Sequence, residues 1–154
     1  MTPYAVKNGD ISIEELELFK DMRARVEGLS DTLLEGTELS CHHICHALSR
    51  LFDVEVADGR FDGMSKHSWL VLKRRTFMQD GENSLVIADM YPVAGVSAFL
   101  FYTAWCTPWK KLYTEDPEFL KEVTQHPNFS RERELVRGGL IKVGGAPLRR
   151  KAVA

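Results

Sequence analysis

The chain has 154 residues, of which 44% are hydrophobic and 27% are charged, and its formal net charge is −2. These values are ordinary for a soluble globular domain that buries a core without disulfides or a metal. The weakly negative net charge does not indicate nucleic acid or an anionic membrane as the main partner, and we expect neither. We predict a single domain over residues 1–154, with a core from about 11 to 143 and a loose C-terminal tail from about 147 to 154.

Cysteine usage and the N-terminal sequence bear on the compartment. The three cysteines show no spacing typical of a disulfide framework, which favours a reducing environment. The first residues lack an apolar signal core, and the longest apolar run, 93–105, is shorter than the ~18 residues of a membrane span. We therefore predict a cytoplasmic protein; signal-independent export as an effector is compatible with the sequence, and the oligomeric state is not indicated.

The N-terminal region is predicted to contain an irregular arm over residues 1–10 and an amphipathic helix over residues 13–28. Ser12 followed by Glu15 is a capping-box pattern, and apolar residues recur behind it at helical spacing. Gly28 is the expected end of this helix.

A second helix is predicted to begin at Cys41 and to run to Phe52. Ser40 is its expected N-cap, and apolar residues from Ile44 onward recur at helical spacing. Cys41 then lies at the positive end of the helix dipole, where a thiolate is favoured and the thiol pKa falls. Cys41 is therefore a candidate nucleophile.

Three strands are predicted after this helix, because the apolar period changes from helical to alternating. They cover residues 53–57, 68–74 and 84–89, with turns at Asp58-Gly59 and at 80–83. We expect an antiparallel meander packed on the cysteine helix, which is an α+β arrangement.

The last third of the chain is less regular. Asp116 before Pro117 is a good helix start, and Ser130 is the expected cap of a short helix that ends at Gly138-Gly139. We predict a segment over 93–102 that is either helical or extended, followed by one helical turn over 108–113. Helices over 116–125 and 130–138 and a final strand over 140–143 complete the chain.

Three residues that carry chemistry fall at the ends of these predicted elements. His67 opens the second strand and Asp89 ends the third, so antiparallel pairing places them side by side at one edge of the sheet. The helix that begins with Cys41 has to present its N-terminus to that edge. A thiol attacks amides when a base takes its proton and a third group orients the base. We predict a catalytic triad of Cys41, His67 and Asp89.

This pattern resembles the core of transglutaminase-like cysteine enzymes, which belong to the broader papain-like group. A cysteine opens a helix, His67-Ser68-Trp69 opens a strand and Asp89 ends the next strand, all within residues 38–92. The resemblance implies a nucleophile-bearing helix packed against a small antiparallel sheet, with additional N- and C-terminal helices. It also implies that Cys41 is the nucleophile, His67 the general base and then acid, and Asp89 the orienting carboxylate, without a cofactor.

The sequence departs from the family directly after the nucleophile, where members often carry an aromatic residue and this chain has His42. Members include peptidases, deamidases and cross-linking acyltransferases that share a thioester intermediate, so the triad does not decide whether water or an amine resolves it. The implied partner is a peptide or protein amide substrate. Residues expected to line the substrate site are Trp69, Tyr91, Trp105, Trp109 and His42.

The same stretch supports two other interpretations. Cys41 with Cys45, or His42 with His46, has the i, i+4 spacing that lets two side chains of one helix share a metal, although no second ligand pair is evident. A catalytically inactive protein-binding module using the Cys41–His46 cluster is the other alternative, because a fold does not guarantee activity. In the enzymatic interpretation no metal is bound, and Cys45 and Cys106 pack in the core.

Overall fold

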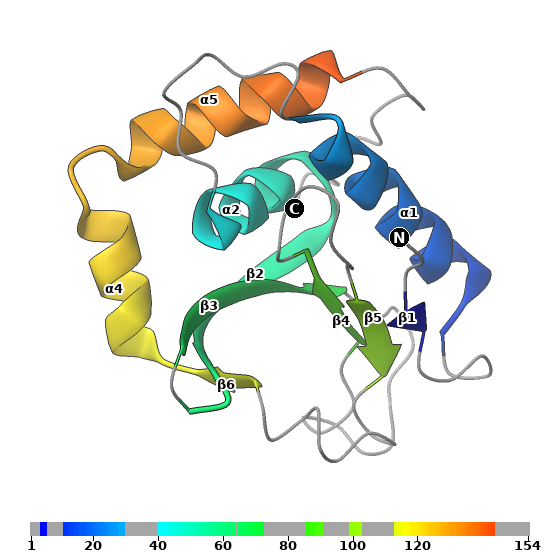
Figure 1. Ribbon diagram of the computed structural model, residues 1–154, viewed down its shortest axis with the longest axis horizontal. Coiled ribbons are helices and arrows are strands. Elements are labelled where there is room, and N and C mark those ends of the chain that lie inside the picture. Colours follow the sequence, from blue (N-terminus) through cyan, green and yellow to red (C-terminus); the bar gives the residue numbers. More distant parts are fainter. Residues whose placement is uncertain are drawn as a thin grey trace.

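A six-stranded sheet and four helices make up the described part of the chain (Figure 1). The structure is a computed structural model that describes residues 4–5, 11–29, 40–63, 65–72, 86–90, 99–102 and 113–143. In sheet order the strands are β1 (Tyr4–Ala5), β5 (Phe99–Tyr102), β4 (Val86–Asp89), β3 (Ser65–Leu72), β2 (Val54–Phe61) and β6 (Tyr113–Glu115). The helices are α1 (Ile13–Glu27), α2 (Cys41–Leu51), α4 (Pro117–Gln125) and α5 (Phe129–Lys142).

The predicted antiparallel meander corresponds to β2, β3 and β4, and the fold is α+β as expected. β3 begins at Ser65, which is earlier than predicted, so His67 lies inside the strand. β5 and β6 extend the antiparallel sheet at its two sides, while β1 pairs parallel with β5. The prediction of an irregular arm over residues 1–10 is therefore wrong at Tyr4–Ala5.

The predicted capping of α1 is confirmed. Ser12 Oγ accepts a hydrogen bond from the N–H of Glu15, and the Glu15 carboxylate accepts one from the N–H of Ser12. These two bonds satisfy backbone donors that the first turn leaves without helical partners. The helix ends before Gly28, and its buried residues are Phe19, Met22, Arg25 and Val26.

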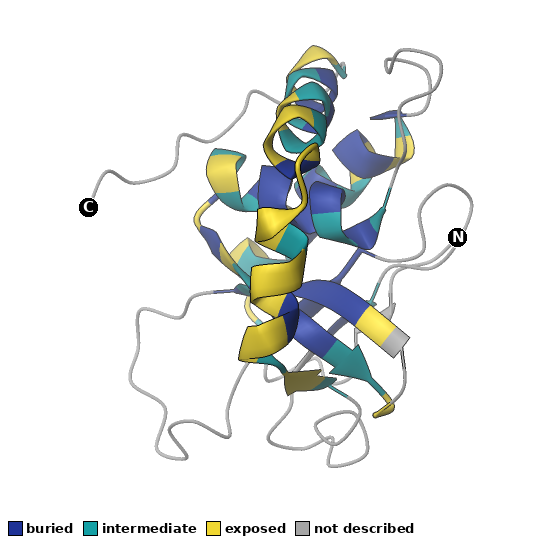
Figure 2. Cartoon of the chain, turned by 90° about the vertical axis from the view of Figure 1, so that its left-hand side faces the viewer, coloured by how far each residue is buried: buried dark blue, intermediate teal, exposed yellow. Residues whose placement is uncertain are grey.

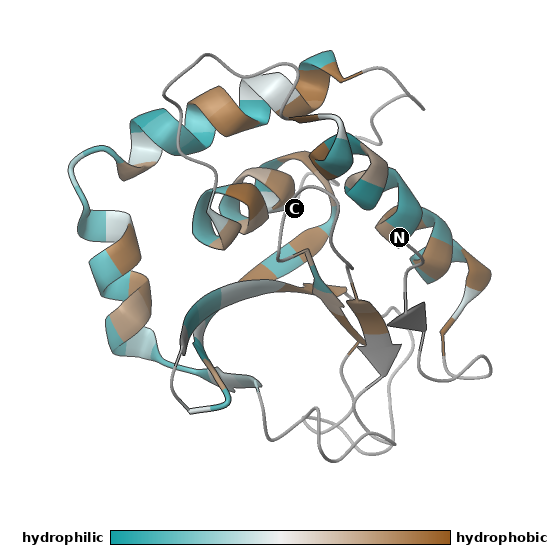
Figure 3. Cartoon of the chain, in the orientation of Figure 1, coloured by the Kyte–Doolittle hydropathy of each residue, from teal (hydrophilic) through white to brown (hydrophobic). Residues whose placement is uncertain are grey.

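α2 lies between the sheet and α5 (Figure 1). Ser40 Oγ accepts from the N–H of His43, which confirms the predicted N-cap. Ile44, Ala47 and Leu48 are fully buried, and Figure 3 shows the apolar residues of this helix. Burial of one aliphatic side chain of this size contributes about 1.5–3 kcal/mol, so the apolar face of α2 fixes where its first residue lies.

α4 runs along the side of the sheet and is largely exposed, as the yellow segments in Figure 2 show. Asp116 caps it by accepting from the N–H of Glu118, so the predicted helix start is confirmed. Lys66 of β3 forms an ion pair with Glu122 over 2.7 Å, and Phe119 is buried beneath the helix. These contacts hold α4 beside the end of the sheet that carries His67.

The predicted turn at Asp58-Gly59 is wrong, because β2 continues through these residues to Phe61. The chain reverses instead at Asp62-Gly63, where φ is 55° and 69°. Asp-Gly suits such a turn because both residues tolerate positive φ, and the pair occurs twice within residues 58–63. At Gly59 the missing side chain permits close approach: a Cβ there would lie 2.0 Å from the carbonyl oxygen of Thr114 in β6.

The C-terminal helix is longer than predicted. α5 begins after Asn128 and continues through Gly138-Gly139 to Lys142, so the short helix ending at the glycines and the strand over 140–143 are both wrong. Val136 and Leu140 are fully buried in the core with residues of α2. This burial outweighs the low helix propensity of glycine, which costs about 1 kcal/mol per residue.

The remaining predictions fall only partly within the described residues. Residues 99–102 of the undecided segment are extended as β5, and Tyr113, the last residue of the expected helical turn, belongs to β6. The rest of that turn, the turn at 80–83 and the C-terminal tail lie outside the described residues. In the part of the chain that the structure covers, no helix combines the length and apolar content needed to cross a bilayer.

Replacement of Gly59 by Ala is expected to destabilise the fold, because the added methyl group would overlap the backbone of β6. We expect the free energy of unfolding to fall by about 1–3 kcal/mol in urea titrations. Gly138→Ala is the matched control: its Cβ meets no atom within 4 Å, and helix propensity predicts a gain of about 0.5–1 kcal/mol. Equal stability of the two variants would contradict the close approach at Gly59.

Candidate active site

Three elements bring Cys41, His67 and Asp89 to one end of the sheet. Cys41 is the first residue of α2, His67 lies near the start of β3, and Asp89 ends β4. The register pairs Leu70 with Ala88, so the end of β4 lies beside the part of β3 that leads to His67. The three residues are largely buried, with exposed fractions of 7%, 5% and 4%.

His67 and Asp89 form a direct pair in which Nε2 of His67 lies 2.9 Å from Oδ2 of Asp89. A carboxylate oxygen accepts hydrogen bonds, so Nε2 carries the proton and donates it. Nδ1 is then the ring atom that can exchange a proton with the thiol. A carboxylate in this position fixes both the tautomer and the orientation of a catalytic histidine.

Tyr113 of β6 is a site residue that the sequence does not predict. Its hydroxyl donates to Oδ2 of Asp89 over 2.6 Å, and its ring packs edge-on against Trp69 with centroids 5.1 Å apart. Burial and the nearby Asp89 raise the pKa of Tyr113, so the phenol keeps its proton and acts as a donor. No local signal identifies it, because it reaches the site only through the pairing of β6 with β2.

The Cys41 thiol has a low pKa. Burial alone would raise it, but hydrogen bonds with His42 and His67 outweigh burial and lower the pKa from 9.0 to about 6. A further hydrogen bond from the backbone of Ser68 acts in the same direction. At neutral pH the side chain is therefore a thiolate, which is the nucleophilic form of cysteine.

The pKa of His67 is shifted the other way. Burial would lower it, but hydrogen bonds with Asp89 and Cys41, and the charges of both residues, raise the pKa from 6.5 to about 9. Thiolate and imidazolium therefore coexist between about pH 6 and pH 9. In this ion pair the base already holds the proton that a leaving group needs.

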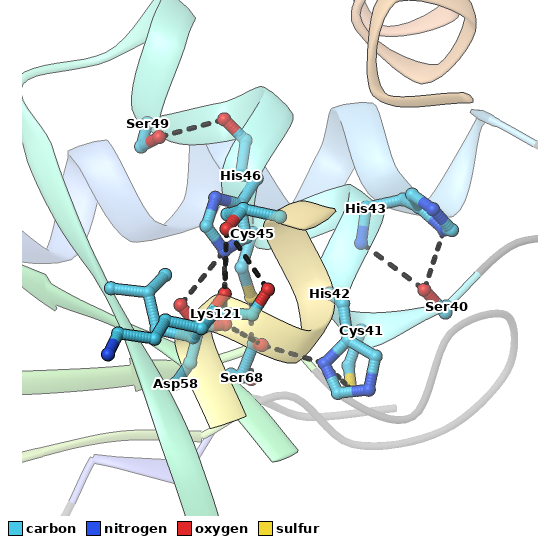
Figure 4. A network of polar contacts seen from close by, with 12 residues as sticks. Ser40, Cys41, His42, His43, Cys45, His46, Ser49, Asp58, Ser68 and Lys121 are labelled. Atoms are coloured by element: carbon cyan, nitrogen blue, oxygen red, sulfur yellow. Dashed lines mark hydrogen bonds and ion pairs between the residues drawn. The ribbon is translucent and has the colours of Figure 1, made fainter. Parts of the chain in front are cut away.

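A second set of polar contacts also reaches the sulfur (Figure 4). Nδ1 and Nε2 of His42 lie 3.6 and 3.9 Å from Sγ of Cys41, and Nδ1 lies 2.7 Å from Oγ of Ser68. The Ser68 hydroxyl donates to Asp58, whose two carboxylate oxygens lie 3.0 and 2.9 Å from Nε2 of His46. A continuous path of hydrogen bonds thus joins the thiol to a buried carboxylate.

Asp58 is the charged end of this path. Its burial would raise the pKa of the carboxyl group, but hydrogen bonds with His46 and Ser68 outweigh burial and hold the pKa below its ordinary value of 3.8. Asp58 and Ser68 are directly paired in the β2–β3 register, so the two side chains share the face that α2 covers. The sequence does not reveal this role, because Asp58 precedes Gly59 and resembles a turn residue.

Two other polar residues of α2 hold the helix in place. Nε2 of His43 lies 2.8 Å from Oε2 of Glu132 in α5, and its Nδ1 lies 2.7 Å from Oγ of Ser40. Cys45 is fully buried and its S–H donates to the carbonyl oxygen of Ser68 over 3.4 Å. Burial raises the pKa of Cys45, which therefore stays a neutral thiol beside the reactive one.

The residues expected to line the substrate site lie in different surroundings. Trp69 is 2% exposed and stacks on the ring of His67 with centroids 6.1 Å apart, so it shields the base. His42 lies beside the thiol, partly exposed, with Phe119 of α4 edge-on at 5.1 Å. The predictions for three aromatic residues fall outside the described part of the chain: Tyr91, Trp105 and Trp109.

The metal-binding alternative requires several ligands that converge. Among the described residues, no group of three or more His, Cys, Asp or Glu side chains could hold a metal ion. His46, from one of the spaced pairs, contacts Asp58, and Cys45, from the other, contacts Ser68. In the described part of the chain, these side chains therefore form contacts between α2 and the sheet.

The start of α2 also offers a donor for an oxyanion. The first N–H groups of a helix have no acceptor within the helix, and Ser40 Oγ accepts from that of His43. The N–H of Cys41 belongs to the same turn and lies next to the Cys41 sulfur. Together with the positive end of the helix dipole, it can stabilise the charge that develops on a substrate carbonyl.

Comparison of the chain with models of protein families, with curated proteins and with solved structures gives no match. The resemblance to transglutaminase-like enzymes therefore stays a prediction, and what the site can do follows from its own geometry.

Cys41 is expected to react with iodoacetamide at a lower pH than an ordinary cysteine. Its lowered pKa places the midpoint of the rate near pH 6, where a thiol with a pKa of 9.0 would be almost wholly protonated, while Cys45 should stay unreactive in the folded protein. Peptide mass spectrometry between about pH 5 and pH 9 resolves the two rates.

His67→Ala removes one of the hydrogen bonds that lower the pKa of Cys41, so the alkylation midpoint should move to higher pH. At pH 7 a pKa of about 6 gives roughly 90% thiolate and a pKa of 9.0 gives roughly 1%, so the shift is easily measured. An unchanged midpoint would show that His67 does not interact with the thiol.

Proposed function

We propose that the chain is a cysteine-dependent hydrolase or acyltransferase that acts on an amide bond of a peptide or protein. One observation carries the proposal: a thiol with a pKa of about 6 interacts with an imidazole whose pKa is about 9 and which is bound to a carboxylate. Groups with opposed pKa shifts cluster at catalytic sites. The resemblance to transglutaminase-like and papain-like enzymes supports the same chemistry.

The first half-reaction transfers the acyl group to the enzyme. The Cys41 thiolate adds to the carbonyl carbon of the amide, and the N–H of Cys41 stabilises the oxyanion. The imidazolium of His67 then gives its proton to the amine nitrogen as the carbon–nitrogen bond breaks. A thioester on Cys41 and a free amine result, and no cofactor takes part.

The second half-reaction resolves the thioester. Attack by water gives a carboxylic acid, and attack by an amine gives a new amide, so the same intermediate serves hydrolysis, deamidation and cross-linking. Each attack requires a base, and His67 is neutral once it has protonated the leaving group.

The surroundings of His67 favour this chemistry because they are apolar. Phe61, Trp69 and Tyr113 surround the ring, with centroids 5.9, 6.1 and 6.2 Å away. Electrostatic interactions are stronger where water is excluded, so the bond to Asp89 holds the ring firmly. Tyr113 adds a second donor to Asp89 and limits the rotation of its carboxylate.

A chromogenic ester provides the first test, because an activated ester acylates a reactive thiol without specific recognition. Mixing the protein with p-nitrophenyl acetate should release a burst of p-nitrophenolate equal to the protein concentration, with an acetyl group on Cys41 detected by mass spectrometry. Cys41→Ala should lose both signals while its circular dichroism and Tm stay unchanged. Cys45→Ala is the matched control and should keep the burst, since Cys45 remains a neutral thiol.

Peptides then define the class of reaction. Peptide-bond cleavage, ammonia release from glutamine side chains and incorporation of an amine dye each report one fate of the thioester. Acetylation confined to cysteines other than Cys41 would overturn the proposal.

Asp89→Asn is expected to lower kcat less than Cys41→Ala does. The amide preserves the shape of the site but carries no charge, so it no longer stabilises the imidazolium of His67 or selects its tautomer, and a loss of about 10²–10⁴-fold is expected. Tyr113→Phe removes a single hydrogen bond to Asp89 and should cost about tenfold. An Asp89→Asn protein that fails to fold would instead count against a catalytic role for Asp89.

A further inference from the structure

Two histidines interact with the Cys41 thiol, but the proposed triad uses only His67. The second, His42, brings both ring nitrogens within 4 Å of the sulfur, at 3.6 and 3.9 Å. Nδ1 of His42 also lies 2.7 Å from Oγ of Ser68, and this hydrogen bond fixes the ring. A side chain in contact with the nucleophile and fixed by a buried network is placed to act in the reaction.

The direction of each hydrogen bond in that network is determined by Asp58. As a carboxylate it only accepts, so Nε2 of His46 donates to it, and the Ser68 hydroxyl donates to it as well. A hydroxyl has one proton, and this bond uses it. The Ser68 oxygen must therefore accept from Nδ1 of His42.

Nδ1 of His42 consequently carries a proton in every state of the ring. In the neutral imidazole the lone pair is then on Nε2, the nitrogen 3.9 Å from the sulfur. The network thus selects one tautomer and leaves the basic nitrogen of His42 3.9 Å from the sulfur that would carry the acyl group.

The two histidines differ in their access to solvent. His67 is 5% exposed, with Nε2 bound to Asp89 and aromatic rings packed around it. His42 is partly exposed. A base that activates an attacking water molecule has to contact that molecule, whereas a base that forms an ion pair with the thiol benefits from burial.

We propose that His42 is a second catalytic base that activates water, or an acceptor amine, in the step that resolves the Cys41 thioester, and that Ser68, Asp58 and His46 position it. This inference rests on the proposed function of the thiol. It divides the two half-reactions between two imidazoles: His67 serves acylation and His42 serves deacylation.

The resolving step balances as follows for hydrolysis. The water oxygen adds to the thioester carbon while one water proton moves to Nε2 of His42. The carbon–sulfur bond then breaks, its electron pair stays on sulfur, and a carboxylic acid leaves. The proton on His42 returns to neutral His67 by way of the sulfur, which interacts with both rings, and this restores the resting ion pair.

Pre-steady-state kinetics with p-nitrophenyl acetate separate the two half-reactions, because the burst reports acylation and the steady rate reports deacylation. We measure at a pH where the thiol is ionised in every variant. His42→Gln keeps a donor toward Ser68 but lacks the base, so its burst rate should stay within about threefold while its steady rate falls about 100-fold or more. Under these conditions His67→Gln should also keep a burst, because its thiol is ionised and p-nitrophenolate leaves without a proton. Its acylation defect should appear with amide substrates, whose leaving amine needs the proton of His67.

His43→Gln is the matched control. His43 is on the same helical turn, but its ring contacts Ser40 and Glu132 rather than the sulfur. Both rates should remain at the wild-type level. Hydroxylamine is the second probe: it attacks thioesters without help from a base, so it should restore the steady rate of His42→Gln.

The positioning role has a readout that does not depend on turnover. Nitrogen-15 shifts of the His42 ring in the resting wild-type protein should identify the tautomer protonated at Nδ1. Ser68→Ala should release this preference and lower the steady rate, and Ser68→Thr, which restores the hydroxyl, should recover both. A resting His42 protonated only at Nε2 would overturn the positioning argument.

The outcomes separate this inference from the proposed function. If wild type gives no burst and no acetyl group on Cys41, the proposed function fails and the role of His42 fails with it. If wild type gives a burst but His42→Gln lowers burst and steady rates equally, or hydroxylamine does not restore turnover, the thiol chemistry stands and the second base is overturned.

Discussion

Ser68 connects the first turns of α2 to the sheet, and the geometry of the thiol depends on this contact. Its backbone interacts with Cys41, its carbonyl oxygen accepts from Cys45, and its hydroxyl joins Asp58 to His42. Ser68 is fully buried in β3, where a polar contact is strong and a missing one is costly. α2 therefore cannot rotate or slide without breaking several bonds together, and His67, which precedes Ser68 in β3, keeps its position relative to the sulfur.

The proximity of Cys41, His67 and Asp89 could be predicted because local sequence defines the elements that end or begin near them. Ser40 marks the start of a helix, and neighbouring strands with alternating apolar residues pair antiparallel. Tyr113 could not be predicted, since β6 joins the sheet by pairing with β2, more than fifty residues earlier in the chain. The role of Asp58 could not be predicted for a different reason. Asp-Gly favours a turn, and only packing decides whether the pair at 58–59 or the pair at 62–63 forms it.

α5 shows how tertiary contacts override a local rule. Gly138-Gly139 is a reasonable helix end by propensity, yet the helix continues because Val136 and Leu140 on either side of the pair are buried. The contact between His43 and Glu132 adds a polar interaction between α2 and α5. Both helices therefore contribute to the placement of the thiol, although only α2 carries chemistry. β1 could not be predicted for a simpler reason: a strand of two residues is too short to show an alternating apolar pattern.

The neutral, buried state of Cys45 affects how the protein tolerates oxidants. A thiolate that is stable at neutral pH is also the form that peroxide converts to sulfenic acid, so the low pKa of Cys41 makes it vulnerable. Many redox-sensitive proteins protect such a sulfur with a second cysteine that captures it as a disulfide. Cys45 is one helical turn away, but it is protonated and its S–H is bound to Ser68. Neither property suits a resolving thiol, so of the two cysteines that the structure describes, Cys45 is not placed to capture an oxidised Cys41.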